Sequence, residues 1–267
     1  DALLHNFGQT DHSDSGITPG YALMLTQKIA AEMGKAGASL SEEQIREVYT
    51  KVMASGDPDS STKRYREILE MIGEQPRYGN DIAEVDAMAR KVSYLFTRKV
   101  EHYRNPRGGV YQAGLYPVSA NVPLGRQTGA TPDGRLAHQP IADGVSPASG
   151  RDLKGPTAAA NSVARLDHLI ASNGTLFNQK FHPSALSGDS GLEAFIALIR
   201  AYFDQKGSHM QFNVVSRETL LDAQQHPENY KTLVVRVAGY SALFTSLSKA
   251  LQDDIINRTE QTFGGGQ

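Results

Sequence analysis

Cysteine, a side chain that often carries covalent and redox chemistry, is missing from this sequence. The 267 residues include no cysteine and no tryptophan. Without cysteine, the chain can form no disulfide, no thiolate zinc site, no cysteine nucleophile and no cysteine-ligated iron–sulfur cluster of its own. Any chemistry that it carries must therefore use other groups.

Three other kinds of site fail on their spacing. The histidines and aspartates near the start match no ordered set of metal ligands, so no metal site is predicted. His182 and Ser184 are neighbours, but no nucleophile elbow surrounds the serine, and a hydrolase triad is not expected. The glycines Gly108, Gly109 and Gly125 lack the strand and helix that a nucleotide-binding loop requires.

One glycine stands out because it lies between two apolar runs. Residues 232–237 are rich in β-branched side chains, and residues 242–247 form a second apolar run. Gly239 is expected at the tip of the turn between them, where glycine reaches positive φ at no steric cost. On local composition, turn formation alone is a sufficient explanation for this glycine.

The elements that would position this turn follow from hydrophobic periodicity. Apolar residues recur at helical spacing in residues 19–34, 41–54, 62–72 and 82–102. The apolar face of the last of these helices is expected to point inward. Its members are Val85, Met88, Ala89, Val92, Leu95, Phe96 and Val100.

Beyond residue 105 glycine and proline become dense, and shorter elements are predicted. They are a bent strand over 110–122, helices over 162–172 and 191–204, and a strand over 211–215. A helix capped by Ser216 precedes the glycine turn. A helix capped by Ser248 follows it and buries Leu251, Ile255 and Ile256. Short strands that alternate with helices indicate an α/β fold.

The overall composition is that of a globular protein. Hydrophobic residues make up 39% and charged residues 21% of the chain. A net charge of −2 argues against a general polyanion binder, so no nucleic-acid partner is expected. No apolar stretch approaches the ~18 residues that cross a bilayer, and no signal-peptide pattern opens the sequence. We therefore expect a cytoplasmic protein without a membrane partner.

The hexapeptide Arg236-Val237-Ala238-Gly239-Tyr240-Ser241 resembles the radical-bearing motif of the glycyl radical enzymes. Further stretches resemble other elements of the same family, in the same order and spacing over about residues 65–263. These stretches are 76–81, 130–135 running on to 150–157, 209–214, and 251–259.

The resemblance implies that Gly239 loses its α-hydrogen and that the backbone stores an unpaired electron. Such a radical needs a flat α-carbon conjugated with both neighbouring peptide groups, and a Cβ would crowd that plane. The flanking apolar runs are expected to keep water and oxygen away. A radical SAM activating enzyme, using S-adenosylmethionine and an Fe–S cluster, would install the radical, so no permanently bound cofactor is expected.

The resemblance also implies a fold, a ten-stranded α/β barrel built from two half-barrels. This chain would supply the later, mainly helical barrel part (1–127) and the C-terminal glycyl-radical domain (128–263), followed by a flexible tail (264–267). The family's thiyl cysteine would lie on an upstream barrel portion or on another subunit. The full enzyme is expected to be a homodimer.

Details of the motifs resemble the eliminase and dehydratase branch of the family. They are Ala238, the stretch 241–244 and the stretch 142–147. The implied activity is radical elimination from a small polar substrate: a diol, an amino alcohol, a hydroxy amino acid or a sulfonate. Two alternatives stay open, an acyl transfer of the formate acetyltransferase type and a non-catalytic, radical-carrying partner subunit.

The loop that lines the substrate cavity in this family maps to residues 112–122. Tyr116 and Ser119 are the candidates for polar substrate contacts. The alternative is that Tyr116 packs on Pro117 and that Ser119 bonds the backbone.

Overall fold

A computed structural model of the protein describes residues 67–68, 70–131 and 133–263. Several predictions concern residues outside these ranges. They are the helices over 19–34 and 41–54, the first part of the helix over 62–72, and the tail 264–267. By its internal contacts the chain divides into two units, residues 1–75 with 125–139 and residues 76–124 with 140–267. The predicted domain boundary at residue 128 stays a prediction.

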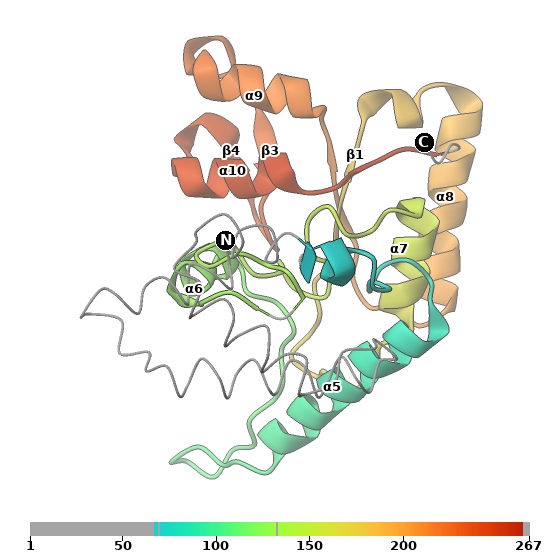
Figure 1. The fold of residues 1–267 in the computed structure, drawn as a ribbon, viewed down its shortest axis with the longest axis vertical. Coiled ribbons are helices and arrows are strands. Elements are labelled where there is room, and N and C mark those ends of the chain that lie inside the picture. The colour runs from blue at the N-terminus through green and yellow to red at the C-terminus, as the bar shows by residue number, and fades with distance from the viewer. Residues whose placement is uncertain (1–66, 69, 132, 264–267) are drawn as a thin grey trace. The chain divides into compact units, whose positions relative to one another are not determined.

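The described part has a mixed α/β fold (Figure 1). Its helices are α5 (Ala83–Glu101), α6 (Asn121–Gln127), α7 (Gly155–Ala164), α8 (Gly188–Asp204), α9 (Arg217–Gln225) and α10 (Lys249–Asn257). Its strands are β1 (Asn178–Phe181), β2 (Gln211–Val214), β3 (Val234–Arg236), β4 (Ser241–Leu243) and β5 (Glu260–Gln261). Short 3₁₀ turns are η2 (Pro183–Leu186), η3 (Pro227–Asn229) and η4 (Phe244–Ser246).

Five strands form one parallel sheet and one hairpin. β1 is the central strand of the sheet, with β2 and β5 parallel to it on either side. β3 and β4 pair antiparallel in a separate two-stranded hairpin. Parallel strands joined through helices agree with the expected α/β fold.

One face of the sheet is apolar and packs on α7 and α8. Phe177 and Phe181 point to the same face of the sheet and are fully buried there with Tyr202 of α8. Ala159 of α7 also has no exposed surface, and its small side chain allows the helix to approach closely. Figure 1 shows β1 between the α7–α8 pair and the hairpin with α10.

The opposite face of the sheet is polar and is nevertheless buried. Asn178 and Lys180 of β1 and Gln211 and Asn213 of β2 are each less than a tenth exposed. The hairpin and α10 cover them. Together with α9, these elements form a second apolar cluster around Val235, Val237, Leu220, Phe244 and Ile255.

Several of the predicted elements are confirmed. α8, β2, α9 and α10 lie where they are expected, and Leu251, Ile255 and Ile256 are buried. Ser216 caps α9 by accepting a hydrogen bond from the backbone of Thr219 at 3.1 Å. Ser248 occupies the N-cap position of α10, but its side chain makes no capping bond. None of the described helices has the length and apolar character needed to cross a membrane.

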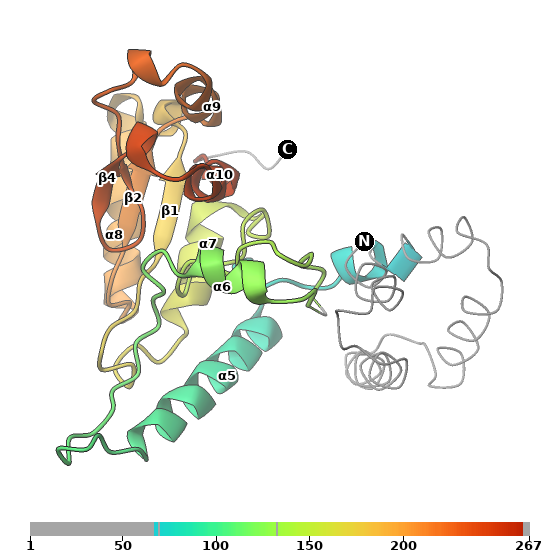
Figure 2. The same cartoon turned by 90° about the vertical axis from the view of Figure 1, so that its left-hand side faces the viewer.

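The helix predicted over 82–102 is confirmed as α5, but its inward apolar face is wrong. Met88, Val92, Leu95 and Phe96 are 50–59% exposed. The buried side chains are Asp86 and Thr97. Periodicity finds an apolar stripe, but it does not say which stretch of chain covers the stripe. Figure 2 shows the C-terminal half of α5 running away from α7.

Polar contacts hold the N-terminal end of α5. Arg165, which follows α7, forms ion pairs with Asp81 and with the buried Asp86. Asn80, just before α5, accepts backbone hydrogen bonds from Leu153 and Lys154. Two motif stretches, 76–81 and 150–157, therefore meet in the fold.

Two elements were predicted wrongly in the glycine-rich part. Residues 110–122 form no continuous strand, because Val118 has a φ of +59° and α6 begins at Asn121. The helix predicted over 162–172 is α7, which runs earlier. Its start is favoured by Pro156, since proline suits the first turn of a helix. Sequence periodicity also missed β1, because its buried residues are mostly polar.

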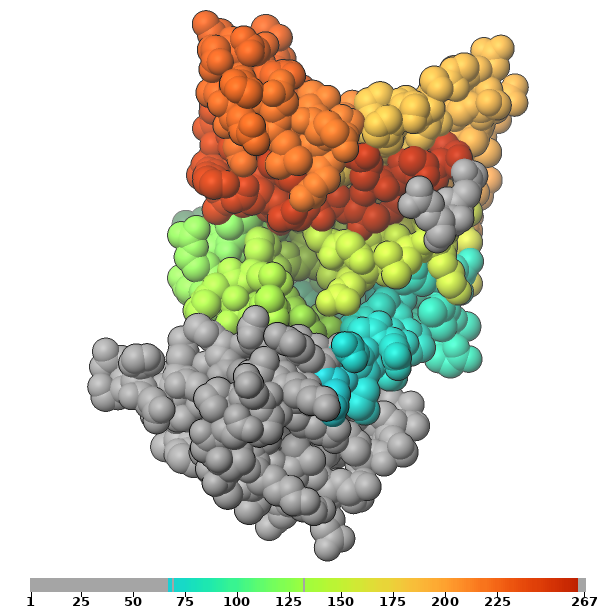
Figure 3. Space-filling model, turned by 45° about the horizontal axis from the view of Figure 1, so that its top comes forward, coloured from blue at the N-terminus to red at the C-terminus, as the bar shows by residue number. Residues whose placement is uncertain are grey.

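The surface above the C-terminal segment is hollowed. In Figure 3, α9 (orange) and the segment around η2 (gold) rise on either side of a depression, with the C-terminal residues (red) below it.

Candidate functional site

The glycine turn is the tip of the β3–β4 hairpin, as predicted. Arg236 pairs with Ser241 across the hairpin, and the Val237 amide donates to the Tyr240 carbonyl at 2.9 Å. Gly239 is the third residue of the four-residue turn and has a φ of +84°. A type II turn needs positive φ at this position, and that need favours glycine.

Sterics add a second reason for glycine at this position. A Cβ on Gly239 would lie 3.3 Å from Cδ1 of Leu176, which is tighter than usual. Within the described part of the chain Gly239 is exposed, although Val237 and Ala238 before it are buried. At the other end of the hairpin the paired Val234 and Leu243 are 58% and 42% exposed. The expected shielding by the flanking apolar runs is therefore incomplete in the residues described.

Gln211 connects the turn to the sheet. Its side-chain oxygen Oε1 accepts a hydrogen bond from the Gly239 amide at 3.1 Å and another from Nη2 of Arg236 at 3.1 Å. Nη1 of Arg236 donates to the Ser241 hydroxyl at 3.0 Å. The guanidinium of Arg236 thus links both hairpin strands to Gln211.

Asn213 connects β3 to the sheet in place of a backbone ladder. Its Nδ2 donates to the Arg236 carbonyl at 2.8 Å, and its Oδ1 accepts from the Arg236 amide at 2.8 Å. The side-chain amide thereby imitates a neighbouring strand. β2 and β3 lie next to each other but belong to separate sheets.

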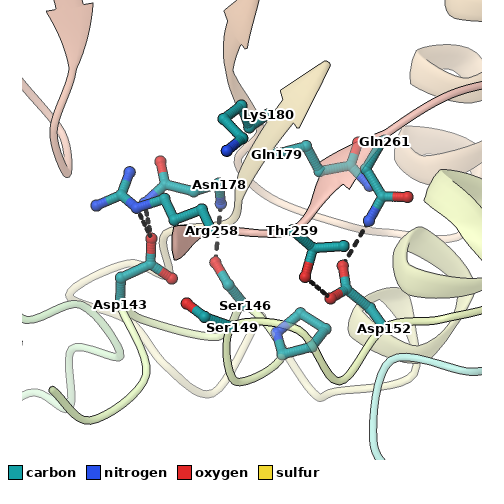
Figure 4. Close-up of a pocket in the computed structure, with 11 residues that line it drawn as sticks. Asp143, Ser146, Ser149, Asp152, Asn178, Gln179, Lys180, Arg258, Thr259 and Gln261 are labelled. Atoms are coloured by element: carbon teal, nitrogen blue, oxygen red, sulfur yellow. Dashed lines mark hydrogen bonds and ion pairs between the residues drawn. The ribbon is translucent and has the colours of Figure 1, made fainter. Parts of the chain in front are cut away.

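A buried ion network holds the start of the turn. Nη1 of Arg258 donates to the Val237 carbonyl at 2.8 Å. The same guanidinium pairs with Asp143 and with Asp254, each at 3.1 Å, and all three side chains are less than a tenth exposed. Burial raises the pKa of Asp254, and the charge of Arg258 opposes this shift. Figure 4 shows Arg258 directed at Asp143.

A small polar pocket of about 20 Å³ lies beside this network (Figure 4). Its volume suits about one water molecule. Asp152 accepts hydrogen bonds there from Thr259 and Gln261, and burial raises its pKa to about 6. Burial lowers the pKa of Lys180, on the same pocket, to about 8. The pocket is too small for an organic substrate, so it braces the C-terminal segment.

His182, Glu218 and Glu260 bring possible metal-ligand atoms within 4.8 Å of one another. Glu260 and His182 have structural partners. Glu260 accepts from the Arg217 amide at 2.7 Å and lies 3.9 Å from the Lys180 ammonium. Nδ1 of His182 lies 2.6 Å from the Ser184 hydroxyl. The ammonium would repel a cation, and these contacts explain the cluster without a metal.

The two predicted substrate residues lie on the loop before α6. Tyr116 is 39% exposed, and its ring edge would touch a Cβ on Gly114 at 2.7 Å, so the ring lies over Gly114. Ser119 is partly buried, and its carbonyl accepts from Val122 at 3.4 Å. Within the described ranges, no hydrogen bond joins either side chain to the glycine turn. Their role in substrate binding stays a prediction.

Sequence reasoning missed the side chains that surround the turn. They are Asp143, Asn178, Gln211, Asn213, Asp254 and Arg258. Five of them belong to the motif stretches 142–147, 209–214 and 251–259, but their roles were not predicted. β1 carries three polar residues in a row and gives no such signal, but alternating polar residues in β2 were an available one. They are normally interpreted as a solvent-facing side of a strand.

Two family models match the chain. Residues 141–245 match the model described as Glycine radical, and residues 1–125 match the one described as Pyruvate formate lyase-like. A probable dehydratase of Escherichia coli is 50% identical over 248 residues, which covers 90% of this chain and 29% of the relative. A trans-4-hydroxy-L-proline dehydratase of Clostridioides difficile is 43% identical and covers 77% of this chain and 26% of the relative.

Solved structures agree with these relatives. A structure for 1,2-propanediol dehydration in Roseburia inulinivorans has a TM-score of 0.76 and 67% identity, covering 82% of this chain and 28% of that one. The glycerol-bound glycerol dehydratase of Clostridium butyricum has a TM-score of 0.74 and 55% identity, covering 83% and 28%. The chain thus spans less than a third of the length of these relatives. The resemblance expected from the motifs is confirmed: the chain belongs to the glycyl radical enzyme family, in its dehydratase branch.

Proposed function

We propose that this chain is the radical-storing part of a glycyl radical dehydratase and that Gly239 holds the radical. The observation that carries the proposal is the place of Gly239. It is an exposed glycine at positive φ, at a hairpin tip, inside the segment matched as Glycine radical. The neighbours that form the radical loop are Arg236, Val237, Ala238, Tyr240 and Ser241.

The proposed activation removes one hydrogen atom. A radical SAM activating enzyme takes the hydrogen from Gly239 Cα and leaves one unpaired electron on that carbon. Conjugation with the flanking peptide groups requires them to be coplanar with Cα. At a φ of +84° the preceding peptide plane is turned well away from this arrangement. Storage of the radical therefore requires rotation about the N–Cα bond, which glycine permits.

The proposed substrate is a small polar molecule, with a vicinal diol as the first candidate. The solved structures at 67% and 55% identity concern 1,2-propanediol and glycerol. Curated relatives named for hydroxyproline and sulfopropanediol are 43% and 41% identical. The higher identities favour the diol over a hydroxy amino acid or a sulfonate.

The proposed elimination needs a cysteine from another part of the protein. The radical at Gly239 passes to that thiol by hydrogen transfer, and the thiyl takes a hydrogen atom from the hydroxyl-bearing carbon of the diol. The hydroxyl of the adjacent carbon leaves as water with the proton of the remaining hydroxyl, whose oxygen becomes the carbonyl of the product radical. The product radical regains hydrogen from the thiol, which becomes thiyl again. The protein supplies orientation and a dry cavity, and Tyr116 and Ser119 are proposed as hydroxyl contacts.

Acyl transfer of the formate acetyltransferase type is the second candidate. It is favoured by the Pyruvate formate lyase-like match and by a PFL-like enzyme of Escherichia coli that is 34% identical over 234 residues. Product analysis separates the two reactions. Aldehyde and water from a diol support elimination, whereas acetyl transfer from pyruvate to coenzyme A supports the alternative.

Electron paramagnetic resonance (EPR) on the full-length protein tests the radical site. After anaerobic activation, we expect a doublet from the single remaining α-hydrogen of Gly239. Incorporation of α-deuterated glycine should collapse the doublet, and Gly239→Ala should abolish it. Gly108→Ala is the matched control, because Gly108 has a φ of +82° and open space around a Cβ. A doublet that survives in Gly239→Ala would refute the assignment.

Exposure to air gives an independent check. Oxygen adds to a backbone radical and cleaves the chain there. The activated protein should therefore release the residues that follow Gly239 as a short fragment. An intact chain after air exposure of a sample with a measured radical signal would count against Gly239.

A further inference from the structure

We infer that Gln211 is a positioning residue for the Gly239 radical. This inference rests on the proposed function. The hairpin is fastened to β2 through side-chain amides: Asn213 bonds the backbone of Arg236, and Gln211 bonds the Gly239 amide beside the radical carbon.

The orientation of the Gln211 amide is set by a chain of hydrogen bonds. Its oxygen accepts from Arg236, whose guanidinium can only donate. Its nitrogen donates to the side-chain oxygen of Asn178. The nitrogen of Asn178 donates in turn to Asp143 at 2.6 Å, and an ionised carboxylate can only accept. Because the two ends of the chain are a pure donor and a pure acceptor, Gln211 must present oxygen to Gly239.

This oxygen can stabilise the radical electronically. The unpaired electron at Cα is shared with the adjacent amide nitrogen, which donates electron density toward it. An acceptor on the N–H strengthens that donation. Gln211 is 5% exposed, so water competes little for the hydrogen bond. The Gly239 amide therefore keeps Gln211 as its hydrogen-bond partner in this arrangement of the turn.

The side-chain attachment also permits the rotation that radical storage requires. A backbone ladder between β2 and β3 would hold the hairpin rigidly. Gln211 and Asn213 bond the Gly239 amide and the Arg236 backbone, which both precede the N–Cα bond of Gly239, so these bonds can stay in place while that torsion changes from +84°. Asn213 holds the last residue of β3, and Gln211 holds the radical-bearing residue itself.

The test uses the full-length protein with Gln211→Leu, which removes the acceptor. Gln211→Glu keeps an acceptor for both donors, and Gln205→Leu changes an exposed glutamine on the far end of α8. After activation, we expect Gln211→Leu to change the α-hydrogen splitting and to lower the radical yield about fivefold, equivalent to ~1 kcal/mol for one hydrogen bond. Gln211→Glu should restore the splitting, because it still accepts from both donors, but only part of the yield, because it loses the donor to Asn178. Gln205→Leu should match the unchanged protein.

The outcomes separate two failures. If the unchanged protein gives no glycyl doublet, the proposed function fails. If it gives the doublet, and Gln211→Leu gives the same splitting and yield while circular dichroism confirms folding, the positioning role is refuted. Should Gln211→Leu fail to fold, Gln211→Met, which is closer in shape and also lacks the acceptor, carries the same expectation.

Discussion

The two faces of the parallel sheet are buried in different ways. One face presents Phe177, Phe181 and Phe212 to α7 and α8, and many side chains there share the contact. The other face presents Gln211 and Asn213 to the glycine hairpin, and each makes specific hydrogen bonds. Apolar packing tolerates small shifts of its partners, whereas a buried amide is satisfied in few arrangements. The glycine turn lies on the face that specifies position.

The largest loss of stability is expected on the apolar face. Phe181 is fully buried and contacts the rings of Phe195, Phe212 and Phe263. Phe181→Ala should lower the free energy of unfolding by about 3–5 kcal/mol, because it leaves a cavity. Urea unfolding measures this loss. Because Phe181 lies on the face opposite the glycine turn, we expect no change in the EPR splitting of the Gly239 radical. A changed splitting would contradict the difference between the two faces.

A somewhat smaller loss, with a dependence on pH, is expected on the polar face. Arg258→Met removes the partner of two buried carboxylates, Asp143 and Asp254. We expect a loss of about 3 kcal/mol at pH 7, since a buried charge is left unpaired. The loss should shrink as the pH falls, because burial raises the pKa of Asp254 and its protonation removes one of the unpaired charges. Unfolding at pH 5 and pH 7 checks this. A loss that is independent of pH would contradict the distinction between the faces.

Asp152, in the polar pocket beside this network, should contribute a weaker dependence of stability on pH. Its folded-state pKa of about 6 lies above the ordinary value of 3.8, because of burial. Between these values the folded state binds more protons than the unfolded state, so stability falls as the pH rises from about 4 to 6. Asp152→Asn should remove about 2 kcal/mol of this change. Unfolding free energies across that range test it, with the exposed Asp204→Asn as control.

The smallest effect is expected at α5. Phe96 is 50% exposed, in contrast to the buried Phe181. In the 267-residue chain, Phe96→Ala should change the unfolding free energy by less than about 1 kcal/mol, as for other surface positions. The same pair of Phe→Ala substitutions thus compares a covered apolar stripe with an uncovered one. A loss at Phe96 as large as at Phe181 would show that α5 is covered after all.

Local signals in the sequence were sufficient to predict the glycine turn, the cap of α9 and the buried stripe of α10. Gly239 falls at the tip of a turn because only glycine takes its φ of +84° without strain. α9 starts at a serine whose side chain caps it, and the stripe of α10 is buried as its periodicity predicts. The order of the motifs was enough to indicate the family. Apart from the order of the motifs, each of these signals lies within a few residues of the feature that it specifies.

The polar side chains that meet at the turn could not be predicted from the sequence, because the tertiary fold brings them together. Asn178, Gln211 and Arg258 lie far apart in the sequence and converge on the residues from Arg236 to Gly239. Alternation in β2 marks a polar face, but it cannot tell a face open to water from one covered by a hairpin. The exposed stripe of α5 is the converse case. Burial depends on which distant segment packs on a face, and local periodicity does not contain that information.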